Sequence, residues 1–545
     1  MDFAEQKESV MSGRFSRRGF LGMVAAGAAV KSVNGQADSG RKPNVLFVMT
    51  DQQRADAIAA LGNSHIYTPN LDRLVGRGVS FVNGYSTCAV CVAARLTIRT
   101  GCEPPTTGCY ANMRPDLVEG QAANNEDRCG TYLARTMARL GYRTFGIGKF
   151  HTSPWDENIG YEVHLHSEEM YGSPEHRARD DYAAFIAKEH PEYDFVEALM
   201  GERTEMYYMP QMSPLPARLG VEAWAADRAV EQINSDDGRP YFGFVSFIGP
   251  HPPCAPPIPF NRMYDPDRMP NPVRGDKEVD GMDEYVLWMN YAIWAEDITD
   301  SHARAVKARC YGEISYIDEC LGRILDAVDA RGDGQNTLIA FFADHGDHLG
   351  DHGAWQKESF FDVACRVPFL VSWPERLPAG ARREELVCLT DLFGIATTAA
   401  ANPELREGAD VLGMLEGQAP ARERLVGYYG VPGTNRFKVM VREGEWKYIY
   451  MANGGLEQLF NLEEDPQELR QRIADATEVA GRMRAAAVEA VRRPNANRAL
   501  DTDGALKKFP REELKRQRIY QFDGSRGVRG FPERPQDVVR PAKPL

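Results

Sequence analysis

Five apolar runs, each followed by polar residues, constrain the fold of this chain more than any other feature. They lie in PNVLFVMTDQQRAD (43–56), YRTFGIGKFH (142–151), YFGFVSFIGPHPP (241–253), TLIAFFADHGDHLGDHG (337–353) and VPFLVSWP (367–374). Such runs are typical of strands buried on both faces of a parallel sheet. Helical patterns lie between them, as in residues 126–141 and 311–332. The alternation predicts an α/β fold with a large, mostly parallel sheet flanked by helices.

The pattern changes after about residue 425. Residues 437–451 predict two short strands joined by a Glu-Gly turn, and residues 461–491 predict a turn followed by a long helix. A chain of 545 residues exceeds the usual size of one compact domain. We therefore expect a large domain over residues 38–425 and a small C-terminal α+β subdomain over 426–545, with an extended tail from about residue 500.

The N-terminus has the order of a signal peptide. Arg17 and Arg18 precede a glycine-broken apolar run from Phe20 to Val30, and small residues follow before Asp38. The run is too short to span a bilayer, and the arginine pair predicts export by the twin-arginine machinery. We expect residues 1–37 to be this signal, with the mature chain periplasmic or exported and not in a membrane. An amphipathic or unstructured N-terminus is the alternative.

Charge and cysteine content limit the functions of the chain. The net charge of -14 argues against a nucleic-acid surface, which needs clustered Lys and Arg. It does not exclude a small anionic substrate, because a pocket can be locally positive. Ten cysteines suggest disulfides in an exported protein, but a twin-arginine substrate folds in the reducing cytosol first. The pairing is not determined, and a Cys102–Cys109 bridge is one option.

Polar residues stand just past four of the predicted strands. They are Asp51 with Gln52, Lys149 with His151, His251, and Asp344 with His345. In open α/β sheets ligands bind beyond the carboxyl ends of the strands, so we expect these residues to meet in one cleft. Carboxylate and amide oxygens suit calcium or another hard divalent ion, and the imidazole leaves the metal open. Taken singly, each pair is more typical of a strand-end turn or a helix cap.

Other patterns in these segments have competing interpretations. His345, His348 and His352 in DHGDHLGDH would suit a zinc or iron site, but the glycines indicate a loop, and one Asp-His pair aimed into the cleft is the simpler hypothesis. Lys149 and His151 alternate and so share a face, where they could bind an oxyanion and move a proton. Lys357 in WQKESFF is a weak signal alone, because solvated lysines are common.

The segment CAVCVAARLTIRTG (88–101) holds two cysteines three residues apart. A CxxC pair suits redox chemistry or a metal, and buried packing is the plainer alternative. Yet CVAARLTIRTG resembles the signature of type I sulfatases, in which Cys-x-Pro-Ser-Arg is followed at fixed spacing by Thr-Gly. Cys91, Arg95, Thr100 and Gly101 stand at the matching positions. Cys88 has no arginine four residues on, so the resemblance singles out Cys91.

The resemblance covers nearly the whole mature chain. Matching segments are PNVLFVMTDQQRAD for the first strand and metal pair, TPNLDRLVGRGVSFVNGY for the helix before the signature, GYRTFGIGKFH, FFADHGDHLGDHG for the second metal pair, and EWKYIY with LFNLEEDPQE for the C-terminal subdomain. Six separated matches in the right order are far more specific than any one alone. The resemblance implies an alkaline phosphatase-like fold, with residues 38–425 as the catalytic domain.

In this family the cysteine is converted to Cα-formylglycine, an aldehyde whose hydrate attacks sulfur and then expels sulfate by collapsing back. Covalent catalysis splits the hydrolysis into two easier steps. The resemblance assigns Asp51, Gln52, Cys91, Asp344 and His345 to one metal ion per chain, expected to be Ca²⁺. It implies that Arg95 orients the hydrate, that Lys149 and Lys357 hold sulfate oxygens, that His151 takes a proton and that His251 acts on the leaving alcohol.

One departure from the family signature concerns maturation. Where the family has Pro-Ser, this chain has Ala93-Ala94. Cys-x-Ala-x-Arg resembles the variant that oxygen-independent, radical-type maturases convert, so we expect such a maturase as a partner.

The predicted activity is hydrolysis of a sulfuric ester. The polar, histidine-bearing segment SPWDENIGYEVHLHSEEMYGSPEH (153–176) favours a sulfated carbohydrate over a small aryl ester, although such histidines are more often plain surface residues. Two alternatives stay open. One is a phosphonate or phosphate diester hydrolase of the same superfamily; the other is an inactive, sulfatase-like protein that binds sulfated glycans.

Overall fold

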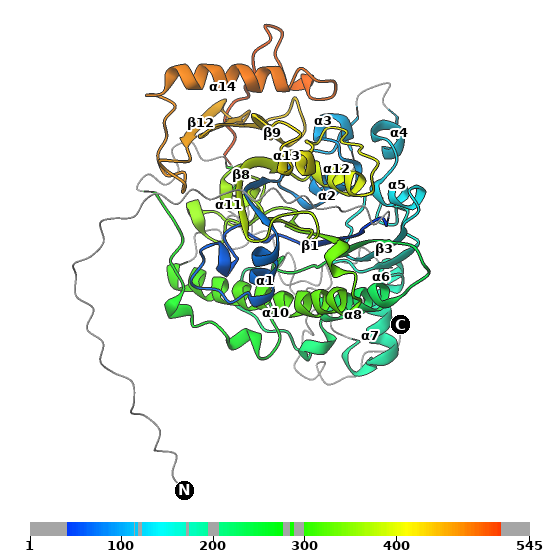
Figure 1. The fold of residues 1–545 in the computed structure, drawn as a ribbon. Helices are drawn as coiled ribbons and strands as arrows, with labels where there is room; N and C mark the ends of the chain where they lie inside the picture. The colour runs from blue at the N-terminus through cyan, green and yellow to red at the C-terminus, as the bar shows by residue number, and fades with distance from the viewer. Residues whose placement is uncertain are drawn as a thin grey trace, which may run out of the picture. The chain divides into compact units, whose positions relative to one another are not determined.

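In a computed structural model, all five apolar runs are strands of one sheet (Figure 1). The structure describes residues 41–113, 115–117, 122–169, 174–194, 207–275, 284–287 and 299–513. The predicted signal peptide lies outside these residues. Within them the sheet has eight strands: β1 (Asn44–Thr50), β2 (Val79–Tyr85), β3 (Arg143–Gly148), β4 (Val163–His166), β5 (Tyr241–Ser246), β6 (Thr337–Ala343), β7 (Phe369–Ser372) and β8 (Ala381–Cys388).

The strand order of this sheet is β4-β3-β5-β1-β6-β7-β2-β8. All neighbours pair in parallel except β7, which is antiparallel to both β6 and β2. The two reversals cancel, so β2 runs in the same direction as β6. The predicted α/β class with a mostly parallel sheet is confirmed.

Helices cover both faces of the sheet (Figure 1). They are α1 (Pro69–Arg77), α2 (Cys91–Thr100), α3 (Pro104–Thr107), α4 (Asn125–Cys129), α5 (Leu133–Arg139), α6 (Pro174–Ala178), α7 (Asp181–Glu189), α8 (Val221–Asn234), α10 (Asp300–Ala330), α11 (Asp362–Cys365), α12 (Asp391–Ala399), α13 (Val411–Leu415) and α14 (Thr477–Ala490). The helix predicted over 311–332 lies in α10, which begins eleven residues earlier and ends at Ala330. The one predicted over 126–141 is broken after α4, where Gly130 has φ +82°.

The central strand β1 faces a separate core on each side. Its side chains Val45, Phe47 and Met49 pack with α2, α5 and α12, whereas Leu46 and Val48 pack with α1, α8 and α10. Alternate residues of a strand point to opposite faces, so a strand covered on both faces must be apolar throughout. This packing explains the uninterrupted apolar run with which the strand was recognised in the sequence.

The C-terminal residues form a second, antiparallel sheet of order β12-β11-β10-β9. Its strands are β9 (Arg424–Tyr429), β10 (Lys438–Glu443), β11 (Trp446–Met451) and β12 (Leu456–Asn461). One face packs against α14, and the other packs against side chains beside the large sheet such as Phe360. The tail runs back to this sheet, where Phe509 pairs with Asn453. Residues from 514 onward lie outside the described part of the chain.

All ten cysteines lie within the described residues, and the disulfide found there joins Cys254 to Cys310. The Cys102–Cys109 option is wrong, because both thiols are free. The Cys102 thiol faces the carbonyl oxygen of Cys129 at 3.7 Å, whereas the Cys109 thiol faces that of Ala111 at 3.5 Å. None of the described helices is long and apolar enough to cross a membrane.

Candidate active site

The predicted polar residues meet at one edge of the large sheet. Asp51 follows β1, Lys149 follows β3, His251 comes five residues after β5, and Asp344 follows β6. Because β3, β5, β1 and β6 are adjacent and parallel, their carboxyl ends lie side by side. All these side chains except that of His151 are almost fully buried.

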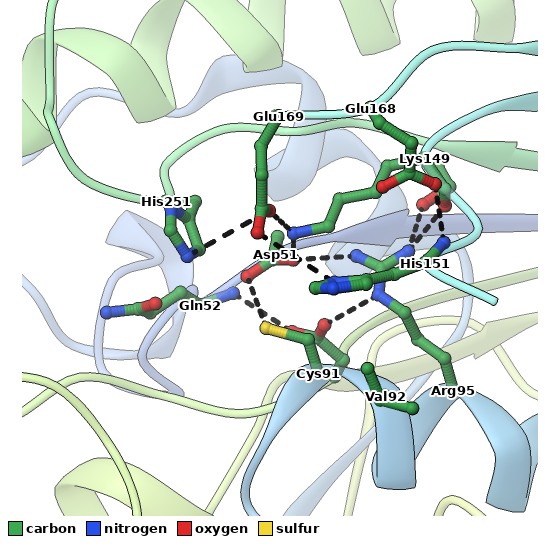
Figure 2. Close-up of polar contacts among 12 residues, drawn as sticks. Asp51, Gln52, Cys91, Val92, Arg95, Lys149, His151, Glu168, Glu169 and His251 are labelled. Carbon is green, nitrogen blue, oxygen red and sulfur yellow. Dashed lines mark hydrogen bonds and ion pairs between the residues drawn. The ribbon is translucent and has the colours of Figure 1, made fainter. Parts of the chain in front are cut away.

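Cys91 comes to the same edge by a different route. Strand β2 runs in the direction of β6, so the chain leaves it at this edge and enters α2, whose first residue is Cys91. The sulfur lies 3.7 Å from Asp51 Oδ1 (Figure 2). It also lies 3.1 Å from His345 Nε2 and 3.1 Å from Lys357 Nζ. The structure therefore brings the singled-out cysteine into the predicted cluster.

The donor atoms of Asp51, Cys91, Asp344 and His345 all lie within 4.8 Å of one another. Two carboxylates and an imidazole in so small a space suit a divalent cation, and the hard oxygen donors favour ions such as calcium. The predicted fifth ligand, Gln52, lies beside the group. Its side-chain oxygen accepts a hydrogen bond from Lys357 at 2.8 Å, and its backbone N–H donates to Asp344 at 3.0 Å.

Arg95 links the two carboxylates of this group. One turn along α2 from Cys91, it donates from Nη2 to Asp51 at 2.8 Å and from Nε to Asp344 at 3.0 Å. Its Nη1 donates to the hydroxyl of Ser246 at the end of β5, at 2.9 Å. A buried guanidinium whose three nitrogens all donate hydrogen bonds holds strands and helix in register.

Burial and the neighbouring cations shift the pKa values of Cys91 and Asp51 in opposite directions, and the effect of the cations is the larger. Burial alone would raise the pKa of Cys91, but Lys357, Lys149 and His345 lower it well below its ordinary value. A hydrogen bond from His151 acts in the same direction and places that imidazole beside the sulfur. Burial also raises the pKa of Asp51, yet the cations Lys149 and Arg95 hold it well below the usual range. The site is thus electropositive around the atom that would carry the reaction.

The carboxylate of Glu169, which the sequence analysis did not identify, lies among Lys149, His151 and His251. Lys149 Nζ contacts Glu169, whose Oε1 lies 3.8 Å from His151 Nδ1 and whose Oε2 lies 4.0 Å from His251 Nε2 (Figure 2). Burial lowers the pKa of His251 to about 3, so its imidazole is neutral here. Glu169 thus lies between three residues that the sequence predicted to take part in the reaction.

Glu168 anchors the backbone of the same region. It accepts hydrogen bonds from the backbone N–H of His151 at 2.6 Å and from His166 Nε2 at 2.7 Å. Both glutamates lie just past β4, the edge strand next to β3. The strand-end rule that found the other polar residues would have found them had the short, partly buried β4 been recognised as a strand.

The alternative three-histidine metal site does not form. His348 Nε2 pairs with the hydroxyl of Ser359 at 2.7 Å, and His352 stacks on Phe361 with ring centroids 4.1 Å apart. Of this run, His345 alone joins the metal-binding group found among the described residues.

A family model described as Sulfatase matches residues 43–400, well over half of the chain. The chain belongs to the sulfatase family. A second model, described as N-sulphoglucosamine sulphohydrolase, C-terminal, matches residues 350–490 of this sulfatase. The matched range includes Lys357 and the small antiparallel sheet.

Known proteins resemble this sulfatase over most of its length. An arylsulfatase of Clostridium perfringens is 28% identical over 452 residues, which are 79% of this chain and 90% of the relative. A choline-sulfatase of Rhizobium meliloti is 29% identical over 454 residues, 78% of this chain and 82% of the relative. The crystal structure of a phosphonate monoester hydrolase of Agrobacterium radiobacter matches with a TM-score of 0.68 and 25% identity, over 84% of this chain and 96% of that one.

Proposed function

We propose that this sulfatase removes sulfate from a sulfated carbohydrate, using formylglycine formed from Cys91 and one bound Ca²⁺ ion. The observation that carries the proposal is the position of Cys91 at the start of α2, 3.1 Å from both His345 and Lys357. An unmodified cysteine would leave a sulfated thiol that needs a difficult hydrolysis of its own. An aldehyde hydrate at this position releases sulfate by collapsing back to the aldehyde.

The surrounding side chains can carry out the other parts of the reaction. A bound divalent ion would neutralise charge on the sulfate and lower the pKa of the attacking hydroxyl. Lys149 and Lys357 are the cations available for sulfate oxygens, and Arg95 keeps Asp51 and Asp344 in place. His151 lies beside residue 91 and can accept the proton whose loss releases sulfate. His251 donates from Nδ1 to the carbonyl oxygen of Pro252 at 2.8 Å, so its Nε2 can donate to the leaving oxygen once it has gained a proton.

We further propose that an oxygen-independent maturase converts Cys91 and that the twin-arginine machinery exports the product to the periplasm or beyond. Ala93-Ala94 after the cysteine supports the first step, and Arg17-Arg18 before a short apolar run supports the second. In the folded protein Cys91 has no exposed surface. We expect conversion to take place before α2 folds onto the sheet.

The carbohydrate as substrate is supported by the C-terminal family model, whose description names a sulphoglucosamine enzyme. The phosphonate monoester hydrolase structure supports a second candidate, hydrolysis of a phosphonate or phosphate ester at the same site. Lys149 and Lys357 favour sulfate and phosphonate alike, since both are tetrahedral anions. A glycan-binding protein without activity is the outcome expected if Cys91 is never converted.

The test combines mass spectrometry with a substrate screen. The chain is expressed with and without an oxygen-independent maturase, and the peptide carrying Cys91 is weighed in each preparation. We expect an aldehyde only in the first. That preparation, supplied with Ca²⁺, is assayed on sulfated sugars, an aryl sulfate, choline sulfate and a phosphonate monoester. Fastest turnover of a sulfated sugar supports the proposal, fastest turnover of the phosphonate supports the second candidate, and a thiol in natively produced protein would falsify the formylglycine route.

A further inference from the structure

A cavity of about 280 Å³ lies beside His251, between the loop that carries this histidine and helices α8 and α10. Two acids line it, Glu222 from α8 and Glu313 from α10. The exposed fractions of Glu222 and Glu313 are 5% and 8%, so both are buried well beyond what is usual for glutamate. Neither acid takes part in the reaction proposed above, and neither stands at a strand end.

The hydrogen bonds of this pair are incomplete. Glu222 Oε1 accepts the backbone N–H of Gly249 at 3.0 Å. Glu313 Oε2 is fully buried and has no hydrogen-bond partner among the described residues. A methyl group placed on Gly249 would lie 3.2 Å from both Glu222 Oε1 and Glu313 Cγ, so the two side chains approach the same point of the His251 loop. A buried oxygen without a donor is costly unless something else supplies one.

The other walls of the cavity provide rings and no positive charge. The hydroxyl of Tyr182 donates to the carbonyl of Leu219 and that of Tyr316 to the carbonyl of Ala217, so the carbonyls engage both hydroxyls and leave the rings as lining. No lysine or arginine is among the described residues that line the cavity. Two acids with aromatic rings, lacking a cation, form the environment that binds an organic ammonium group.

We propose that this cavity binds the ammonium group of an amino sugar, held by Glu222 and Glu313 while the sulfate lies at Cys91. The inference rests on the proposed function, since it names the substrate class of the same site. His251 connects the two places, because it lines the cavity and also faces the catalytic cluster through Glu169. An ammonium group supplies three N–H donors, and its positive charge would balance the negative charge of two buried carboxylates.

The size and electrostatics of the cavity agree with this occupant. The volume of about 280 Å³ exceeds what a bare metal ion fills and accommodates part of a sugar ring. Burial raises the pKa of Glu222 to about 7 and, together with the charge of Glu222, raises that of Glu313. Each acid therefore keeps its proton to a higher pH than an exposed glutamate does, and binding of an ammonium group would favour loss of that proton. The remaining titratable groups in the walls are Tyr182, Tyr316 and His251, of which the tyrosines stay neutral.

Binding can be tested apart from catalysis. The unconverted protein, with Cys91 as a thiol, is titrated by calorimetry with glucosamine and with N-acetylglucosamine, which has the same ring without the charge. We expect glucosamine to bind more tightly and E313Q to weaken its binding about tenfold, since the amide oxygen can still accept a hydrogen bond but the charge of the carboxylate is lost. The matched control is E319Q, an exposed glutamate on the same helix. Equal affinity for both sugars, or no effect of E313Q, overturns the proposal.

Kinetics of the converted enzyme provide the second arm. The expected result is a kcat/KM for glucosamine 6-sulfate that falls about tenfold in E313Q, with that for N-acetylglucosamine 6-sulfate unchanged. Unfolding curves show whether each variant is folded, and E222Q replaces E313Q if the latter is not. Glutamate-dependent binding of glucosamine without sulfate release from either sugar would support the cavity and reject the sulfatase proposal. If sulfate release from both sugars depends equally on Glu313, the proposal that the cavity binds the ammonium group is rejected.

Discussion

At the scale of single residues, charge balance in the buried cluster depends on Arg95. Asp51 and Asp344 are fully buried, and the guanidinium between them donates to both carboxylates. Two carboxylates this close raise the cost of ionising each other unless a cation compensates. Arg95 therefore also stabilises the fold by balancing the charges of Asp51 and Asp344, a role that the signature alone does not indicate.

Replacing Arg95 with methionine should make this dependence visible. R95M leaves two buried carboxylates without their shared partner and should lower the free energy of unfolding by about 3–5 kcal/mol. Urea unfolding of the metal-free protein measures it. R139M, at an exposed arginine in α5, is the control for loss of a positive charge. A loss below about 1 kcal/mol in R95M would show that the carboxylates are compensated in another way.

The His166–Glu168 pair gives a pH-dependent prediction. Burial opposes both charges, but Glu168 raises the pKa of His166, and His166 in turn lowers that of Glu168 to about 2. The stabilisation from Glu168 is lost as pH falls below its ordinary pKa of 4.5, and that from His166 is lost as pH rises through its raised value. H166Q should thus cost about 2 kcal/mol between pH 5 and 6 and much less at pH 9. Thermal unfolding across pH checks it; a cost that is independent of pH would contradict an ionic pair.

At the scale of elements, the ends of β3 and β5 lie so close that residue 148 has to be glycine. Gly148 has φ +96°, and a Cβ there would lie 2.0 Å from the carbonyl oxygen of Ser246. That carbonyl accepts the N–H of Lys149 at 2.9 Å. The close approach brings Lys149 to Asp51 and the Ser246 hydroxyl to Arg95.

Gly148→Ala should therefore disturb both stability and the site. We expect a loss of about 3 kcal/mol in unfolding free energy, from the unfavourable φ and the clash with the strand together. Gly141→Ala is the matched control, since Gly141 has φ +87° and no atom within 4 Å of an added Cβ. The control should lose only about 1–2 kcal/mol. Equal losses in the two variants would mean that the strands can separate at no cost.

At the scale of the whole molecule, side chains of the small C-terminal sheet hold the loop that carries Lys357 by hydrogen bonds and ion pairs. Lys438 of β10 donates to the carbonyl of Glu358, one residue from Lys357. Lys447 of β11 is fully buried and contacts both Asp362 and Glu468. Residues 80 or more positions downstream in the chain thereby hold the Lys357 loop in place.

Lys447→Met tests this connection. It leaves Asp362 and Glu468 buried without a cation, and we expect a loss of about 3–5 kcal/mol in unfolding free energy. Sulfate release by the folded fraction should also fall, because α11 follows the Lys357 loop directly. Lys188→Met removes a surface lysine paired with Glu189 and should change neither quantity. Unchanged activity in folded K447M would show that the Lys357 loop keeps its position without contacts from the C-terminal sheet.

Several parts of this architecture could be predicted because they depend on local preference. Val45–Met49 is apolar throughout because β1 is covered on both faces, and polar residues follow where it meets the sheet edge. Cys91 and Arg95 lie one helical turn apart, so their common direction was implicit in their spacing. The same reasoning missed β4, because its short stretch of four partly buried residues has no continuous apolar pattern.

What the sequence by itself determined about this protein is five of the eight strands of the large sheet, the polar groups past four of them and the cysteine of the signature. Only the tertiary structure decided that Glu169 lies among Lys149, His151 and His251, and that Cys254 pairs with Cys310 rather than Cys102 with Cys109. It also decided that Glu222 and Glu313, 91 positions apart, share one cavity. The physical reason is that periodicity encodes which face of an element is buried, whereas contacts between distant side chains follow from strand order and close packing.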